Sequence, residues 1–130
     1  MNARFLLDTH VVLRWIATPR RLTREQTRVL RDALRNREPI AISAISLLEI
    51  CVSPGGRDFS PAEIPHVLES APGFEIIPFS IEIATDVAAL GPSLRDPADR
   101  AIVCTARVHG LRLITSDQRI IDSGLVPVVV

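Results

Sequence analysis

Short apolar runs rich in β-branched residues alternate with longer helical patterns, and this alternation constrains the fold most. The strand-like runs are residues 4–7, 39–43, 74–79, 111–116 and 126–130. Helical patterns occupy residues 10–17, 23–38, 44–52, 62–70, 80–91, 97–109 and 117–122. Strands that alternate with helices predict an α/β fold with a mainly parallel sheet.

The composition indicates one soluble domain that spans residues 1–130. Hydrophobic residues make up 47% of the chain, which is enough to build a core. No apolar run reaches the roughly 18 residues that a membrane span needs, so we expect a cytoplasmic protein without membrane contacts. Cys51 and Cys104 lie in apolar helical patterns and are expected to be buried thiols, not a disulfide.

Acidic residues directly follow two of the expected strands. Asp8 comes after residues 4–7, and Asp117 comes after residues 111–116. Ligands bind beyond the carboxyl ends of the strands in sheets of this kind, so both side chains are placed for function. Each aspartate also precedes a helix, where it can cap the backbone N–H groups. The pattern leaves both roles open for either residue alone.

Two further acidic residues lie in helical patterns at positions that should face the core. Glu49 has apolar neighbours on both sides, and Asp99 precedes the sheet-facing positions 102, 103 and 106. A buried charge is unfavourable unless it has a partner. The structural alternatives are a capping box between Ser46 and Glu49, and a first helical turn in which Asp96 is the N-cap.

Four carboxylates therefore converge on one edge of the expected sheet. Carboxylates that lie together raise one another's pKa and stay ionised together only around a cation. Oxygen ligands without Cys or His favour Mg²⁺ or Mn²⁺, and such a site suits in-line displacement at phosphorus. The predicted catalytic and metal-binding residues are Asp8, Glu49, Asp99 and Asp117, with Asp96 as a candidate fifth ligand.

The acidic segments resemble those of PIN-domain ribonucleases, and most closely the VapC-like toxins of type II toxin–antitoxin pairs. The matching segments are LLDTHVVLRWI, ISAISLLEI and RDPADRAIVCTARVHGLRLITSD, which carry the four acidic residues in order. Two positions depart from the VapC-like pattern, because Leu94 and Ala98 stand where a histidine and an aromatic residue are usual. Neither position is a carboxylate, so the predicted metal site is unaffected.

The resemblance implies a fold, partners and an activity. The implied fold has three layers, with a five-stranded sheet of order 3-2-1-4-5 flanked by helices, and the implied assembly is a homodimer. The implied activity is that of an endoribonuclease that needs Mg²⁺ or Mn²⁺, with RNA as substrate and a small antitoxin as partner. Thr9 and Arg100 adjoin Asp8 and Asp99 and are expected to contact the substrate.

Other functions are also compatible with an aspartate after the first strand. Enzymes that form an aspartyl phosphate need a lysine, and all fifteen basic residues of this chain are arginine. A PIN-fold nuclease that acts on another nucleic acid, and a catalytically inactive PIN binding module, both remain open. Residues 20–37 hold seven arginines, which form either an RNA-binding face or a solvated helix face. Trp15 is expected in the core or at a dimer contact.

Overall fold

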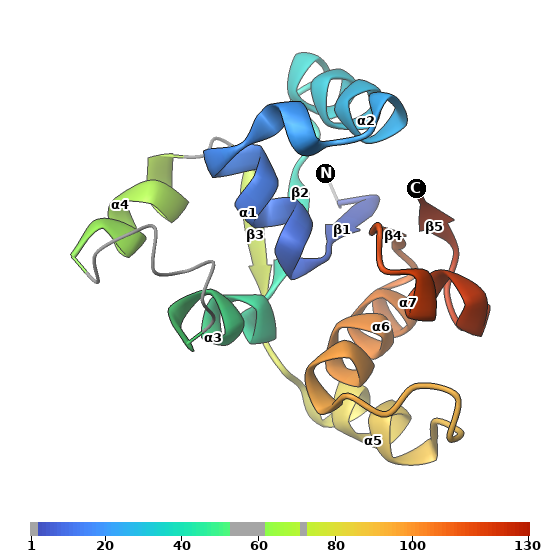
Figure 1. Cartoon of the computed structure of the whole chain (residues 1–130). Helices are drawn as coiled ribbons and strands as arrows, with labels where there is room; N and C mark the ends of the chain where they lie inside the picture. The colour runs from blue at the N-terminus through green and yellow to red at the C-terminus, as the bar shows by residue number, and fades with distance from the viewer. Residues whose placement is uncertain (1–2, 53–61, 71–72) are drawn as a thin grey trace.

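Five parallel strands form the sheet at the centre of the molecule. The computed structural model describes residues 3–52, 62–70 and 73–130. The strands are β1 (Phe5–Leu7), β2 (Ile40–Ser43), β3 (Phe74–Ile77), β4 (Arg112–Ile114) and β5 (Val128–Val129). Their order is β3-β2-β1-β4-β5 and every neighbouring pair is parallel, which confirms the predicted topology (Figure 1).

Helices cover both faces of this sheet and make three layers. They are α1 (Thr9–Ala17), the 3₁₀-helix η1 (Pro19–Arg21), α2 (Arg24–Arg35), α3 (Ala44–Val52), α4 (Glu63–Ser70), α5 (Ile81–Ala89), α6 (Pro97–His109) and α7 (Gln118–Ser123). Figure 1 shows α1 and α2 on one side of the strands and α5 and α6 on the other.

The central strand β1 contributes side chains to two separate apolar clusters. Leu6 packs in the cluster that contains residues of α5, α6 and α7. Phe5 and Leu7 point to the opposite face and pack with residues of α1 and α2. A strand buried on both faces is apolar throughout, which is why residues 5–7 read as a continuous apolar run.

The helix ends follow the capping signals in the sequence. Thr23 and Gln26 form the predicted reciprocal capping box at the start of α2. Helix α6 spans residues 97–109 as predicted and ends at Gly110, whose φ of 66° is left-handed. Helix α2 ends at Arg35, three residues earlier than predicted, because Arg37 adopts a φ of 55° ahead of Pro39.

Three side chains outside the acidic edge, those of Trp15, Cys51 and Cys104, were also given expected places by the sequence. Trp15 packs edge-on against Phe74 with ring centroids 5.5 Å apart, as expected for a residue packed against the core. Cys104 is buried as predicted, but the prediction for Cys51 is wrong, because the last turn of α3 is exposed. None of the described helices combines the length and apolarity that crossing a membrane requires.

Candidate metal-binding active site

Asp8 is buried at the carboxyl end of β1, where α1 begins. One carboxylate oxygen, Oδ1, accepts a hydrogen bond from the backbone N–H of Thr9 at 2.8 Å and so caps α1. The other, Oδ2, accepts from the hydroxyl of Thr115 at 2.7 Å. The backbone N–H of Asp8 donates to the carbonyl of Ile114 in β4. Asp8 is therefore an N-cap whose second oxygen is turned toward the end of β4.

Thr9 connects this edge to Glu49 on α3. The Thr9 hydroxyl lies 2.5 Å from Glu49 Oε1 and 2.9 Å from Ser46 Oγ. Helix α3 begins at Ala44, two residues before Ser46, so Ser46 lies inside the helix and is not its N-cap. Ser43 instead accepts from the N–H of Ile45 at the helix start. The Ser46–Glu49 capping box is therefore absent, and the Glu49 carboxylate is held toward the start of α1.

Asp99 lies in the first turn of α6 and is the least satisfied of the four carboxylates. Its side chain is 13% exposed. The pKa of this carboxyl is raised to about 7, chiefly by burial and also by the charges of Asp96, Asp8 and Asp117, while Arg119 opposes the shift. The Asp96 side chain caps α6 by accepting from the N–H groups of Ala98 and Asp99. Asp99 is therefore the group that most needs a cation.

Arg119 supplies a positive charge within the acidic edge. Its Nη2 lies 3.0 Å from Asp117 Oδ2 and 3.4 Å from Asp99 Oδ2, so one guanidinium bridges two carboxylates. Asp117 also caps α7 by accepting from the N–H of Arg119. The side-chain hydrogen bonds from Arg119 hold the pKa of Asp117 below its ordinary value.

His10 joins the start of α1 to the segment that precedes Asp117. Its Nε2 accepts from the backbone N–H of Ser116 at 3.0 Å, and this acceptor role places the ring proton on Nδ1. Nδ1 lies 3.4 Å from Asp8 Oδ2. Burial lowers the pKa of the imidazole, and the nearby Arg14 charge lowers it too, although Asp8 raises it. His10 is therefore a neutral link between two strand ends.

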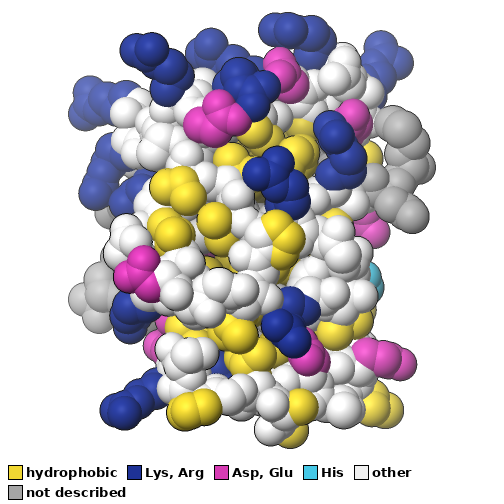
Figure 2. All heavy atoms as spheres, turned by 90° about the vertical axis from the view of Figure 1, so that its right-hand side faces the viewer, with side chains coloured by type: hydrophobic (Ala, Val, Ile, Leu, Met, Phe, Trp, Pro, Cys, Tyr) yellow, Lys and Arg dark blue, Asp and Glu magenta, His cyan; other side chains and the backbone are white. Residues whose placement is uncertain are grey.

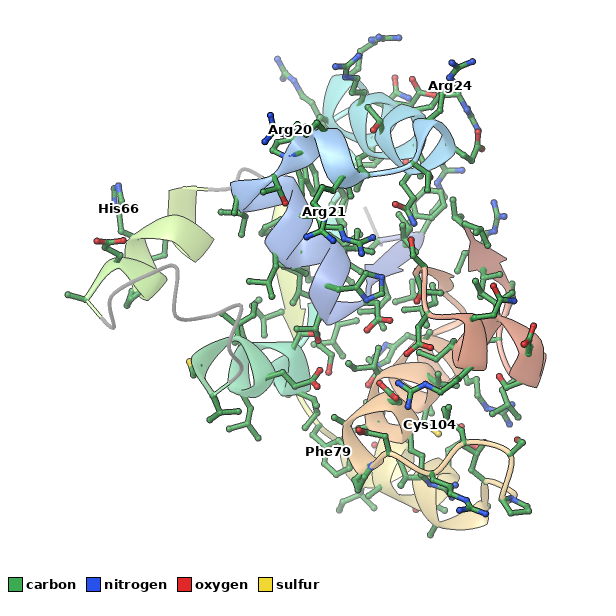
Figure 3. All side chains as sticks on the ribbon, viewed as in Figure 1. Arg20, Arg21, Arg24, His66, Phe79 and Cys104 are labelled. Atoms are coloured by element: carbon green, nitrogen blue, oxygen red, sulfur yellow. The ribbon has the colours of Figure 1, made fainter. Side chains whose placement is uncertain are left out.

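The four predicted acidic residues come from four different elements and lie along one edge of the sheet, and their charges act in two overlapping groups. The charges of Asp8 and Asp117 act on Asp99, and those of Asp8, Asp117 and Glu49 act on His10. Figure 1 shows α1, α3, α6 and α7 arranged around the ends of β1 and β4. In the side-chain view, carboxyl oxygen atoms gather in this same central region (Figure 3).

The donor set fits a hard divalent cation. All four side chains offer oxygen, which Mg²⁺ and Mn²⁺ prefer. The guanidinium between Asp99 and Asp117 stands where a cation would relieve their repulsion. Within residues 3–52, 62–70 and 73–130, no three His, Cys, Asp or Glu side chains form a preassembled metal cluster. Holding an ion with more than two of these residues therefore requires side-chain rearrangement, beginning with Arg119.

The structure does not support the predicted substrate contact by Arg100. Its guanidinium donates to the backbone carbonyls at the end of α5 and in the following loop, which are those of Val87, Leu90, Gly91 and Leu94, at 2.6–2.9 Å. Both terminal nitrogens are used in these bonds. The predicted role is therefore withdrawn, because Arg100 fastens the loop before α6 to that helix.

Three polar side chains of the site were not assigned from the sequence. They are His10, Thr115 and Arg119, which contact the predicted carboxylates or their neighbours. Thr115 and Arg119 each stand two positions from Asp117, and His10 stands two positions from Asp8. That local spacing was the available signal.

Comparisons with known proteins agree with this fold. The model of the PIN domain family matches residues 5–123. Ribonuclease VapC22 of Mycobacterium tuberculosis is 31% identical over 118 residues, which is 88% of each chain. A toxin–antitoxin complex from Klebsiella pneumoniae contains a chain with 28% identity and a TM-score of 0.69, covering 96% of this chain and 95% of that one.

A more distant structure supports the fold alone. In VapBC2 from Rickettsia felis, bound to a promoter DNA fragment, a chain with 19% identity superposes with a TM-score of 0.74 and 96% coverage of both chains. A helix-flanked parallel sheet of this order with an acidic edge defines a PIN-type fold, and the chain belongs to the PIN domain family. Within that family it is VapC-like, as its sequence segments indicated.

Proposed function

We propose that this protein is a metal-dependent endoribonuclease and the toxin of a toxin–antitoxin pair. The observation that carries the proposal is the proximity of Asp8 and Asp117 to Asp99 at the carboxyl edge of a PIN-type sheet, where the pKa of Asp99 is raised to about 7. Similarity to a ribonuclease and to a toxin–antitoxin complex supports the substrate class and the partner.

The chain's own residues would hold Mg²⁺ or Mn²⁺ and position a phosphodiester beside it. Asp8 and Asp99 are the central ligands of this proposal, with Asp117 and Glu49 completing the set and Asp96 as a candidate outer contact. A bound divalent cation would polarise the phosphate and lower the pKa of a water ligand. Thr9 is retained as a candidate substrate contact, and its hydroxyl also orients Glu49.

We also propose a homodimer formed through apolar side chains around α3 and the start of α5. Leu48 and Val52 of α3 are 59% and 70% exposed, and Phe79 and Ile81 are 46% and 83% exposed. In Figure 3, Phe79 lies between α3 and α5. Large apolar side chains exposed together mark surfaces that protein partners cover.

The test is cleavage of total bacterial RNA by the purified protein with Mn²⁺, with Mg²⁺ and with EDTA, followed by mapping of new 5′ ends. We expect metal-dependent cuts that Asp8→Asn and Asp99→Asn abolish. Asp86→Asn is the matched control, because Asp86 pairs with Arg107 away from the acidic edge. Equal cutting by the folded Asp99→Asn variant would overturn the catalytic assignment, and cutting of single-stranded DNA alone would overturn the substrate class.

A further inference from the structure

RNA is a polyanion and must approach an edge that carries several carboxylates, so nearby unpaired cations are required. Arg119 is paired with Asp99 and Asp117, and Arg100 is engaged by backbone carbonyls. We propose that Arg14 and Arg21 bind RNA phosphates beside the acidic site and hold the strand that the site cleaves. This inference rests on the proposed function, because it takes RNA as the substrate.

Arg14 lies one helical turn from the residue that contacts Asp8. It follows His10 by four positions on α1, so the two side chains share a helix face. Its charge acts on the His10 imidazole, whose Nδ1 lies 3.4 Å from Asp8 Oδ2. Among the described residues, no carboxylate forms a salt bridge with Arg14. The guanidinium is therefore next to the acidic edge and available to a phosphate.

Arg21 extends the same positive surface from η1. This short helix packs against α1, and Arg21 is exposed. Figure 3 shows Arg21 reaching across α1 toward the centre of the view, whereas Arg20 and Arg24 point outward. No salt bridge to Arg21 occurs in the described part of the chain. Arg14 and Arg21 can thus contact phosphates on one strand that runs along α1 into the site.

The neighbouring start of α2 is fixed to the edge of the site. Gln26, in the first turn of α2, is fully buried, and its Nε2 donates to Ser116 Oγ at 2.9 Å. Ser116 in turn donates its N–H to His10 and directly precedes Asp117. The start of α2, which follows the segment that carries Arg21, is therefore held beside the acidic residues by a short chain of hydrogen bonds.

Two of the four arginines of α2 are paired with acidic residues on the same helix. Arg28 forms ion pairs with Glu25 and Asp32, and Arg35 lies 3.7 Å from Asp32. Figure 2 shows this basic side of the molecule with acidic side chains interspersed among the arginines. Arg28 and Arg35 are thus paired side chains on α2, and they supply a matched control for Arg14 and Arg21, which form no salt bridge in the described part of the chain.

The test compares Arg14→Gln/Arg21→Gln with Arg28→Gln/Arg35→Gln, which remove the same charge. The probe is a fluorescein-labelled 20-nucleotide RNA of random sequence, followed by anisotropy in EDTA so that it stays intact. We expect about tenfold weaker binding for the first pair, and a salt dependence of log K reduced by about 1.4, since each phosphate contact to a single strand contributes about 0.7. The control should stay within twofold of the unmodified protein.

Equal weakening by both double variants, or unchanged binding by Arg14→Gln/Arg21→Gln, would overturn the inference. If that variant does not fold, the two single variants replace it, each with a slope change of about 0.7. Cleavage by the unmodified protein separates the two proposals. Cleavage together with unchanged binding by the arginine variant refutes only this inference. If Arg14→Gln/Arg21→Gln alone weakens RNA binding but the unmodified protein cleaves no RNA, only the proposed nuclease activity is refuted.

Discussion

Removing the Asp99 carboxylate should stabilise the metal-free protein at neutral and alkaline pH while it abolishes activity. The folded-state pKa of Asp99 is about 7, against an ordinary value of 3.8. Between these values the folded protein holds a proton that the unfolded chain has lost, so the free energy of unfolding falls as pH rises. The full difference corresponds to about 4 kcal/mol, since one pKa unit is about 1.4 kcal/mol.

The Asp99→Asn variant carries no such penalty, because its amide does not ionise. Its advantage over the unmodified protein should grow by about 3 kcal/mol between pH 5 and pH 8, a shift of roughly 10 °C in Tm at the upper pH. Urea unfolding in EDTA measures this, with the fluorescence of Trp15, the sole tryptophan, as the signal.

A control with the opposite sign is available in Asp86. The hydrogen bond from Arg107 holds the pKa of Asp86 below its ordinary value, so this group stabilises the fold above its unfolded pKa and loses that effect as pH falls. Asp86→Asn should therefore cost at most about 1 kcal/mol at pH 7 and less at low pH. The reasoning fails if Asp99→Asn is less stable than the unmodified protein at pH 8, or if their difference is independent of pH.

Three further perturbations separate the roles assigned above. Arg119→Gln should tighten Mn²⁺ binding on the order of tenfold, because the substitution removes a competing cation. Electron paramagnetic resonance of free Mn²⁺ measures this affinity, and the control variant Arg107→Gln should leave it unchanged. Arg100→Gln should cost about 3 kcal/mol in urea unfolding, and Arg100→Lys should restore little of it, because an ammonium cannot reach four carbonyls at once. Leu48→Asp with Ile81→Asp should give monomers in light scattering at concentrations where the unmodified protein is dimeric; an unchanged mass would place the dimer contact elsewhere.

Local signals predicted the elements well wherever a single residue marks an end. Helix α6 has its observed bounds because Pro97 suits the first turn and Gly110 adopts the left-handed conformation that ends it. The ends of α2 and β5 were predicted less well, since these depend on a turn at Arg37 and on how far β4 extends as a pairing partner.

The contacts within the site were beyond the reach of sequence spacing. Thr115 and Asp8 are 107 positions apart, and Ser116 and His10 are 106 apart. No helical or strand periodicity links such residues; only the parallel pairing of β1 with β4 brings them together. The exposure of Cys51 was missed for a similar reason. Helix α3 is mostly apolar, so its sequence alone does not indicate which side chains face the core.

The sequence left open whether the aspartates are helix caps or metal ligands, and the observed caps are compatible with the proposed metal ligation. Asp8, Asp96 and Asp117 each accept a backbone N–H at a helix start. A carboxylate has two oxygens and about four acceptor positions, so a cap leaves capacity for a cation. Asp99 receives no such bond in the described chain and is the carboxyl whose pKa rises to about 7. Capping therefore fixes the direction of the neighbouring carboxylates, and Asp99 is the group whose ionisation a cation would favour most.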